Sequence, residues 1–499
     1  MTKLYKLALA VLLPFTAVAQ QEILTVPIKS FSGKISTIKD ISPAIDDAGN
    51  TCLYLTQYNL FTKFTSTYFL SLTPTGQVLG KTKLNSDFIE QQDFLGSLDQ
   101  GESFHFYKYS KTDRGYKIIQ HKVNKATGEN TILPDLEPEL LKGCKFVTSF
   151  TEGNQVYMLF YSKKESALQV LQLDANSQSN IKTIVITIDN GPSRFLRYSD
   201  VEFMNEKSAK TVYAAHHQKK LYKQGDKLYF VFDAFMLGNT KFTTTDILEL
   251  DLTNSTSKLT KLPEMPYKTG LNFNSYLFKD QLFRVQVSSK ELILDVYELP
   301  TLKQLKNYSY GKDDQLTLKS TPVLKRGAAT IYDSDYKVLE KTSEVLRKMD
   351  KGTPAITVEE TGTNTLQLTI GSYVAPTPSG GYGGGMGMPM GGGTISTPGG
   401  SVTLPSTRMA MASPGFYSQG SGVSTYFKAF LNAATYTKVE HTTGRTLQDQ
   451  VDDYEIHLQK GDKRIGSTAT YKANGNAYFV YEDLDEKALK LVMFSAPAQ

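Results

Sequence analysis

Residues 101–107 read Gly101-Glu102-Ser103-Phe104-His105-Phe106-Tyr107, a polar turn that runs straight into an aromatic-rich segment. Glycine and small polar residues favour a turn, and alternating aromatic residues favour a strand. The same arrangement recurs along the chain and marks seven units. The strand segments that follow the turns are residues 52–55, 104–107, 156–161, 228–232, 282–287, 366–370 and 478–481. One unit repeated over the whole length predicts a repeat architecture.

Each unit continues with a second apolar segment. These second strands are expected at residues 68–72, 116–123, 168–173, 247–252, 292–297, 426–431 and 489–494. Weaker third strands are expected at residues 78–84, 131–133, 184–188, 259–262, around Tyr308 and at 436–439. The seventh unit has no third strand of its own, whereas an unassigned strand at residues 23–31 opens the mature chain. An N-terminal strand that completes the last unit would close a ring and hide its free edges.

The sequence therefore predicts an all-β fold, a seven-bladed β-propeller closed by the N-terminal strand, with four short strands per blade. Six or eight blades fit the same spacing, and the units match no WD40 or kelch signature. The rival architecture is a pair of β-sandwich domains. No linker divides the chain near its middle, which favours a single propeller domain over residues 20–499.

Composition excludes several classes of protein. The 499 residues carry 55 Lys and Arg against 50 Asp and Glu, a net charge of +5 that makes no case for nucleic-acid binding. No internal run of 18 apolar residues exists, which rules out a polytopic membrane protein. Aromatic residues reach 11%, which favours strands and excludes disorder over the full length.

The N-terminus has the pattern of a secretory signal peptide at residues 1–19. Lys3 and Lys6 precede an apolar run, and Ala17-Val18-Ala19 is typical of a cleavage site before Gln20. The prediction is export, to the periplasm with an association with the outer membrane. That location permits a disulfide between Cys52 and Cys144, although their apolar neighbours favour two separate buried thiols.

Two insertions interrupt the later units. The first, at about residues 333–350, is expected to be helical, capped by Asp333 or Ser334 and ended by Gly352 and Pro354. It is interpreted as a helix packed on the propeller rim or as a docking helix for a partner.

The second insertion, at about residues 374–423, is rich in Gly and Met and nearly free of charge. Half of residues 379–400 are Gly, and Arg408 is the single charged residue between positions 361 and 427. It reads as a flexible surface loop or as an insert into an apolar, confined partner such as a pore mouth. Met adapts to irregular apolar surfaces, so the candidate partner-binding residues are Tyr382, Met386, Met388, Met390, Met409 and Met411.

Motifs for chemistry are missing from the sequence. The six His form no metal-ligand pair; His216-His217 would point to opposite faces of a strand, and His105 is expected on the polar side of its strand. The carboxylate pairs Asp46-Asp47, Asp313-Asp314 and Asp452-Asp453 are expected in turns, bonded to nearby amides. Catalytic residues, metal ligands and cofactor-binding residues are therefore predicted to be none, and no cofactor is expected.

The signal pattern before Gln20 and the Gly/Met insert give the chain a family resemblance. It is similar to exported Bacteroidota β-propeller proteins, in particular the plug-type subunit of the type IX secretion translocon. The resemblance implies a non-catalytic propeller that binds a protein partner, an outer-membrane β-barrel, and occludes a pore or scaffolds the barrel. The alternatives are a propeller hydrolase or lyase acting on glycan or peptide, with its site in the central channel, and a surface glycan-binding module.

Overall fold

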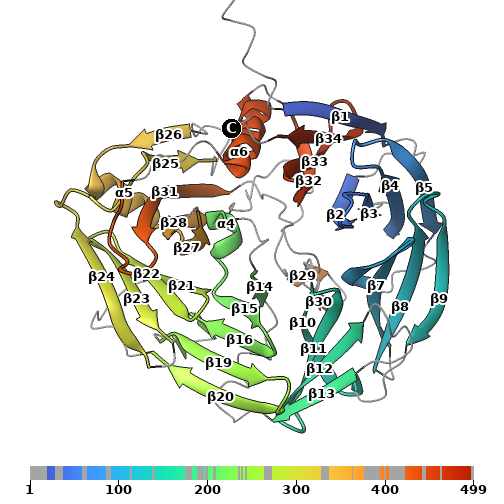
Figure 1. Cartoon of the computed structure of the whole chain (residues 1–499), viewed down its shortest axis with the longest axis horizontal. Coiled ribbons are helices and arrows are strands. Elements are labelled where there is room, and N and C mark those ends of the chain that lie inside the picture. The colour runs from blue at the N-terminus through green and yellow to red at the C-terminus, as the bar shows by residue number, and fades with distance from the viewer. Residues whose placement is uncertain are drawn as a thin grey trace, which may run out of the picture.

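Seven sheets are arranged in a ring in the computed structural model (Figure 1). The structure describes residues 20–28, 37–58, 65–85, 92–112, 115–136, 141–174, 182–187, 196, 201–205, 210–233, 236–237, 240–241, 244–262, 272–299, 301–327, 336–361, 364–375, 394–397, 400–403, 422–440, 446–460 and 463–495. The predicted signal peptide at residues 1–19 lies outside these ranges.

The first four blades follow one another along the chain. Blade 1 consists of β2 (Thr37–Ile45), β3 (Thr51–Tyr58), β4 (Thr65–Leu72) and β5 (Val78–Asn85). Blade 2 consists of β6 (Gln92–Gln100), β7 (Ser103–Thr112), β8 (Gly115–Asn124) and β9 (Asn130–Leu136). Blade 3 consists of β10 (Cys144–Glu152), β11 (Gln155–Ser162), β12 (Ala167–Asp174) and β13 (Lys182–Thr187). Blade 4 consists of β14 (Glu202–Phe203), β15 (Lys219–Gln224), β16 (Lys227–Phe232), β19 (Asp246–Asp251) and β20 (Thr256–Lys261).

The last three blades complete the ring. Blade 5 consists of β21 (Asn272–Phe278), β22 (Gln281–Val287), β23 (Glu291–Glu298) and β24 (Lys303–Gly311). Blade 6 has the spatial order β26 (Tyr336–Leu339), β25 (Val323–Arg326), β31 (Val423–Asn432), β28 (Thr365–Val374) and β27 (Thr353–Glu360). Blade 7 has the order β1 (Gln20–Pro27), β34 (Ala488–Phe494), β33 (Asn476–Asp483) and β32 (Ile465–Ala473).

The ring closes as predicted. The N-terminal strand β1 pairs antiparallel with β34, from Gln20 opposite Phe494 to Pro27 opposite Ala488, and so supplies the outer strand of blade 7. The described residues form seven blades, and all neighbouring strands within them are antiparallel except β14 and β15. Two hairpins lie outside the blades: β17 (Met236–Leu237) with β18 (Thr240–Lys241), and β29 (Thr394–Thr397) with β30 (Gly400–Thr403).

Two expectations about strands were wrong. The segments after the repeated turns are not the first strands of their blades, since each is preceded by another strand of its sheet: β2, β6, β10, β15, β21, β27 and β32. Residues 436–439 form no strand but a single bridge between Lys438 and Leu431. The outer strands of blade 6 are β25, which lies before the expected helical insertion, and β26, which lies within it.

Three helices are described: α4 (Val212–Ala215), α5 (Thr342–Met349) and α6 (Leu447–Lys460). Helix α5 lies within the expected insertion but begins at Thr342, because residues 336–339 form β26 instead. Its N-cap is therefore Lys341, not Asp333 or Ser334. Among the described residues, no helix has the length and apolarity that a bilayer crossing requires.

Apolar side chains join most neighbouring blades. Tyr54 of blade 1 stacks on Phe94 of blade 2 with ring centroids 4.8 Å apart, and Phe150 of blade 3 stacks on Phe203 of blade 4 at 4.0 Å. Similar apolar clusters connect blades 2 and 3, blades 4, 5 and 6, and blades 7 and 1. Such burial, at about 25 cal/mol per Å² of apolar surface, is the main force that holds a propeller ring together.

The seam between blades 6 and 7 is different. In the described part of the chain no apolar cluster contains strands of both blades, and α6 lies between them (Figure 1). Val451 and Leu458 of α6 pack on Phe479 and Phe494 of blade 7. Towards blade 6 the helix presents acidic side chains. One side of this seam is therefore apolar and the other is polar.

Candidate functional site

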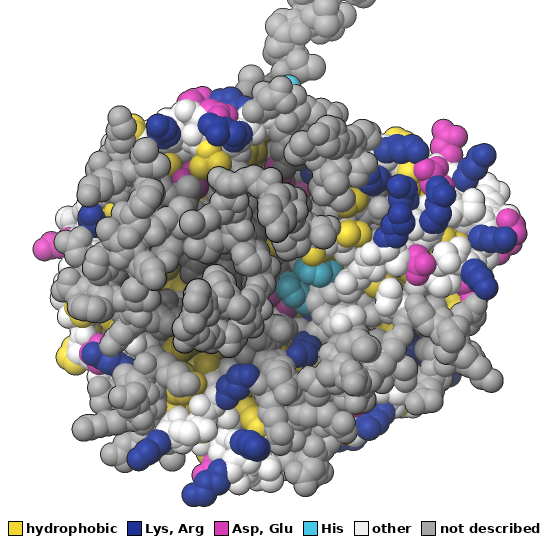
Figure 2. Space-filling model, turned by 180° about the vertical axis from the view of Figure 1, so that it is seen from behind, with side chains coloured by type: hydrophobic (Ala, Val, Ile, Leu, Met, Phe, Trp, Pro, Cys, Tyr) yellow, Lys and Arg dark blue, Asp and Glu magenta, His cyan; other side chains and the backbone are white. Residues whose placement is uncertain are grey.

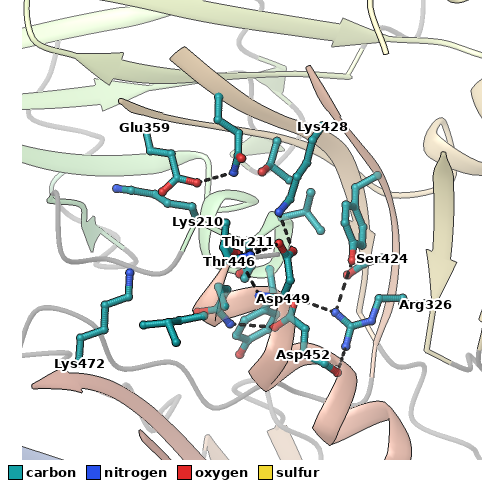
Figure 3. Close-up of a pocket in the computed structure, with 17 residues that line it drawn as sticks. Lys210, Thr211, Arg326, Glu359, Ser424, Lys428, Thr446, Asp449, Asp452 and Lys472 are labelled. Carbon is teal, nitrogen blue, oxygen red and sulfur yellow. Dashed lines mark hydrogen bonds and ion pairs between the residues drawn. The ribbon is translucent and has the colours of Figure 1, made fainter. Parts of the chain in front are cut away.

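A pocket of about 250 Å³ opens at this polar seam (Figure 3). Residues just before and within α4, four strands of blade 6 (β25, β27, β28 and β31), helix α6 and β32 of blade 7 all contribute to its wall. The polar and charged residues of the wall are Lys210, Thr211, Arg326, Glu359, Gln367, Thr369, Ser424, Lys428, Thr446, Gln448, Asp449, Asp452 and Lys472. The apolar and aromatic residues are Val212, Tyr213, Tyr426 and Leu447.

Two ion pairs fix α6 against blade 6. Arg326 donates from Nη1 to Oδ2 of Asp452 and from Nη2 to its backbone oxygen, both at 2.9 Å. Lys428 Nζ lies 2.6 Å from Oδ1 of Asp449. Because both pairs are largely buried, the loss of one partner would leave an uncompensated charge.

The start of α6 has a capping box. Thr446 Oγ1 accepts from the amide of Asp449, and Oδ2 of Asp449 accepts in return from the amide and hydroxyl of Thr446. Burial raises the pKa of Asp449, but Lys428 and Thr446 outweigh that effect and hold the pKa below its usual value. Asp449 is therefore ionised and occupied on both oxygens.

Three charged side chains of the pocket, Glu359, Lys472 and Lys210, have no ion-pair partner in the described residues. Glu359 accepts one hydrogen bond, from Gln367 Nε2 at 2.5 Å, and burial raises its pKa although Lys210, Lys472 and Lys428 counteract that effect. Lys472 is exposed and extends from β32 into the pocket (Figure 3). Lys210 Nζ donates to the backbone oxygen of Asn205 and to the Tyr276 hydroxyl, both at 2.8 Å.

A second group of titratable side chains lies at the inner end of blade 4, beyond α4. It consists of His216 and His217, which are half-buried, and Glu202, which is buried. Figure 2 shows histidine side chains next to an acidic one near the centre of this face of the molecule. The two histidine rings are 4.3 Å apart, and His217 Nε2 is 3.9 Å from Glu202 Oε2. Burial raises the pKa of Glu202 to about 8 and lowers that of both histidines. Burial therefore favours the neutral forms of all three groups.

This group continues into a buried network that joins blades 4 and 5. Lys220 donates to Asn274 Oδ1 at 2.8 Å and lies 3.5 Å from Asp233. Asp233 accepts from the amide and hydroxyl of Ser275. Asn274 Nδ2 also donates to the backbone oxygens of His216 and His217, so these hydrogen bonds tie blade 5 to the segment that leads into β15.

The structure tests only some of the site residues that the sequence predicts. The partner-binding candidates Tyr382, Met386, Met388, Met390, Met409 and Met411 lie outside the described residues and stay a prediction, although the backbone of β29 and β30 falls within that insertion. His216-His217 do not form an extended segment but end α4, with adjacent rings. His105 is buried, so the expectation that it lies on the polar side of its strand was wrong. Burial of the ring lowers the pKa of His105 to about 4.

The structure also tests the expectations for the carboxylate pairs and the two cysteines. Asp46 and Asp314 accept from nearby backbone amides in turns, as expected. Asp452-Asp453 lie in α6, so the expected turn is wrong there. Neither cysteine forms a disulfide; Cys52 is buried as expected, whereas Cys144 is only half-buried. No group of three or more His, Cys, Asp or Glu in the described ranges is arranged to hold a metal.

Sequence reasoning missed the pocket because its residues are spread from position 210 to position 472. One local signal was available: Thr446 and Asp449 have capping-box spacing, and Leu447, Val451, Tyr454 and Leu458 repeat at helical spacing. These residues predict α6, and with it a charged helix between the last two units.

No protein-family model matches the chain, and no curated protein matches its sequence. Among solved structures, the β-propeller domain of the trilobed protease from Pyrococcus furiosus is 7% identical, with a TM-score of 0.35 over 93% of this chain and 95% of that one. The propeller of Dos1 is 10% identical, with a TM-score of 0.28 over 79% and 78%. An apocarotenoid oxygenase mutant from Synechocystis is 11% identical, with a TM-score of 0.29. This match covers 55% of this chain and 62% of the oxygenase, less than two thirds of either. No function is carried over from any of them.

Proposed function

We propose that this protein is a non-catalytic, exported propeller that binds a protein partner, and that the pocket at the seam of blades 6 and 7 receives a segment of that partner. The observation that carries the proposal is the seam itself. Other neighbouring blades share apolar side chains, whereas here a helix, two ion pairs and a polar pocket stand in their place. A polar recess between rigid walls suits recognition of a polar segment.

Two of the three carboxylates that line the pocket are engaged in structural contacts, which favours binding over catalysis for these two groups. Asp449 and Asp452 are engaged by Lys428, Thr446 and Arg326, and those contacts hold α6 in place. A general acid or base needs an accessible proton and a pKa near the working pH. These two carboxylates are committed to positioning the helix instead.

For the location we propose the periplasm, with the partner an outer-membrane β-barrel that the propeller occludes or scaffolds. The signal-peptide pattern at residues 1–19 and the uncharged Gly/Met insertion support this part of the proposal. Cell fractionation should recover the protein with the outer membrane, and recovery in the cytoplasm would overturn this part.

Site-specific photocrosslinking tests the pocket. We would replace Lys472 by p-benzoylphenylalanine in the full chain and irradiate living cells. The control carries the same group at Lys303, an exposed residue on the outermost strand of blade 5. We expect one crosslinked species from position 472, identified by sequencing as an outer-membrane protein, and none from position 303. Equal crosslinking at both positions, or none at 472, contradicts the proposal.

Deletion of residues 379–400 tests the insertion separately. If the insertion enters the partner, the deletion should abolish the crosslinked species from position 472 while leaving the protein folded. Unchanged crosslinking would restrict partner binding to the pocket and remove the Met residues from the site.

A further inference from the structure

The pocket contains two buried polar atoms without partners. Gln367 and Thr369 both line it and are 2% and 3% exposed. Oε1 of Gln367 and Oγ1 of Thr369 have no hydrogen-bond partner in the described part of the chain. Buried polar groups are nearly always paired, so two unpaired ones in a single cavity indicate a ligand that pairs with them.

The placement of these two atoms fits a polypeptide. Gln367 and Thr369 alternate on β28, so their side chains project from the same face of the strand. Gln367 Nε2 donates to Glu359, which leaves Oε1 as an acceptor, and the Thr369 hydroxyl can donate. An acceptor and a donor at a two-residue interval match an N–H and a C=O on an extended peptide.

The charge of the pocket adds a requirement. Its wall has four cations, Lys210, Arg326, Lys428 and Lys472, and three anions, Glu359, Asp449 and Asp452. Arg326 and Lys428 are neutralised by the α6 carboxylates. Glu359 faces both Lys210 and Lys472, so one positive charge remains without a counterpart.

We infer that the pocket binds an extended peptide segment that carries a carboxylate. This inference rests on the proposed function and names the chemistry of the partner's segment. The peptide main chain bonds Gln367 Oε1 and Thr369 Oγ1, and the carboxylate lies at Lys472. An acidic side chain and a free C-terminus supply the same group, and the experiment separates them.

The test uses the full mature chain and short fluorescein-labelled Gly/Ser peptides in fluorescence anisotropy. One peptide has an internal Asp and an amidated C-terminus, one has no Asp and a free C-terminus, and one is neutral and amidated. We expect at least one anionic peptide to bind about fivefold more tightly than the neutral one, as expected for one exposed ion pair. Added salt should weaken this preference.

Matched variants separate the two contacts. Lys472→Met should remove the preference for the anionic peptide and leave the affinity for the neutral peptide unchanged. Lys303→Met should change neither the preference nor the affinity. Thr369→Val should raise the dissociation constant of all three peptides about fivefold, because one hydrogen bond is lost. Thr357→Val removes an equally buried hydroxyl outside the pocket and should have no effect.

The outcomes distinguish this inference from the proposed function. If the wild-type protein binds all three peptides equally and Thr369→Val binds none of them, the carboxylate requirement is overturned and the peptide site stands. Binding that neither Thr369→Val nor Lys472→Met affects would overturn the inference entirely, while the crosslink from position 472 would still decide the proposed function.

Discussion

Glu482 accepts a hydrogen bond from the backbone amide of Ile38 through Oε1 at 3.1 Å. Glu482 is on β33 of blade 7 and Ile38 on β2 of blade 1, so the bond crosses the seam next to the closing strand. The register of β2 shifts between Ile38 and Asp40, and such a bulge leaves an amide without its ladder partner. The carboxylate supplies that partner. Gly466 makes the room, since a Cβ there would lie 2.2 Å from Glu482 Oε2.

Glu482 should make stability depend on pH. Burial raises its pKa to about 7 from the model-peptide value of 4.5, although the amides of Ile38 and Ser467 counteract the effect. The folded state then binds more protons than the unfolded state between these values, so the free energy of unfolding should fall as pH rises from about 4.5 to 7 and level off above. Denaturant titrations across this range measure it.

Two variants check the assignment. Glu482→Gln keeps an acceptor but cannot titrate, and it should flatten the slope between pH 4.5 and 7. Glu482→Leu leaves the Ile38 amide unpaired and should cost about 1–3 kcal/mol. An unchanged slope in Glu482→Gln would assign the pH dependence to other groups.

Lys108 should give the opposite slope at higher pH. It is buried between blades 1 and 2, with Nζ 3.4 Å from Thr67 Oγ1 and 5.3 Å from the centroid of the Tyr54 ring. Burial lowers its pKa to about 7 from 10.5. The folded state then binds fewer protons between these values, so stability should rise with pH from about 7 to 10.

Lys108→Met should stabilise the protein at pH 7 and remove this rise, because it keeps the apolar stem and deletes the buried amine. Thermal unfolding of the variant at several pH values measures both effects. Lys303→Met, at an exposed position, serves as the control and should reproduce the wild-type curve.

Arg326→Met should loosen α6 locally. The loss of Arg326 leaves Asp452 buried next to Glu455, whose pKa burial already raises to about 8, and this should cost about 3 kcal/mol. Hydrogen exchange should speed up in α6 and β31 and stay unchanged in blades 1 to 3. Arg464→Met breaks an exposed pair with Asp485 and should cost less than about 1 kcal/mol. Uniformly faster exchange in Arg326→Met would contradict a local seam.

Removal of residues 20–27 should expose the edge of β34. These residues form β1, and without them the amides and carbonyls of β34 face solvent. Size-exclusion chromatography with light scattering should show aggregates for the truncated chain. A synthetic peptide of residues 20–28, added in trans, should restore the monomer; if it does not, closure by strand pairing is not what keeps the ring soluble.

The sequence predicts the number of blades and the closing strand because strands such as β3, β11 and β22 are buried on both faces. Val156 to Tyr161 in β11 are all buried, and such runs are conspicuous. The innermost strands were not predicted because they contain charged residues and proline among their apolar residues. Strand β2 contains Lys39, Asp40 and Pro43, which read as a loop.

The pocket escaped prediction for a different reason. Lys210, Thr369, Asp449 and Lys472 belong to four different elements, and only the closure of the ring brings them together. Helix α6 was hidden by Asp452 and Asp453, whose adjacency suggested a turn; in the structure Asp452 instead pairs with Arg326, 126 positions earlier.

The pairing of β1 with β34 also sets the order of events when the protein is made. Blade 7 takes one strand from residues 20–27 and its others from residues 465–494, so a ribosome must finish nearly the whole chain before this blade can form. The other six blades are contiguous in sequence and can fold as they emerge. A chain threaded across a membrane in extended form would therefore remain an open arc, with β1 unpaired, until its final strand arrives.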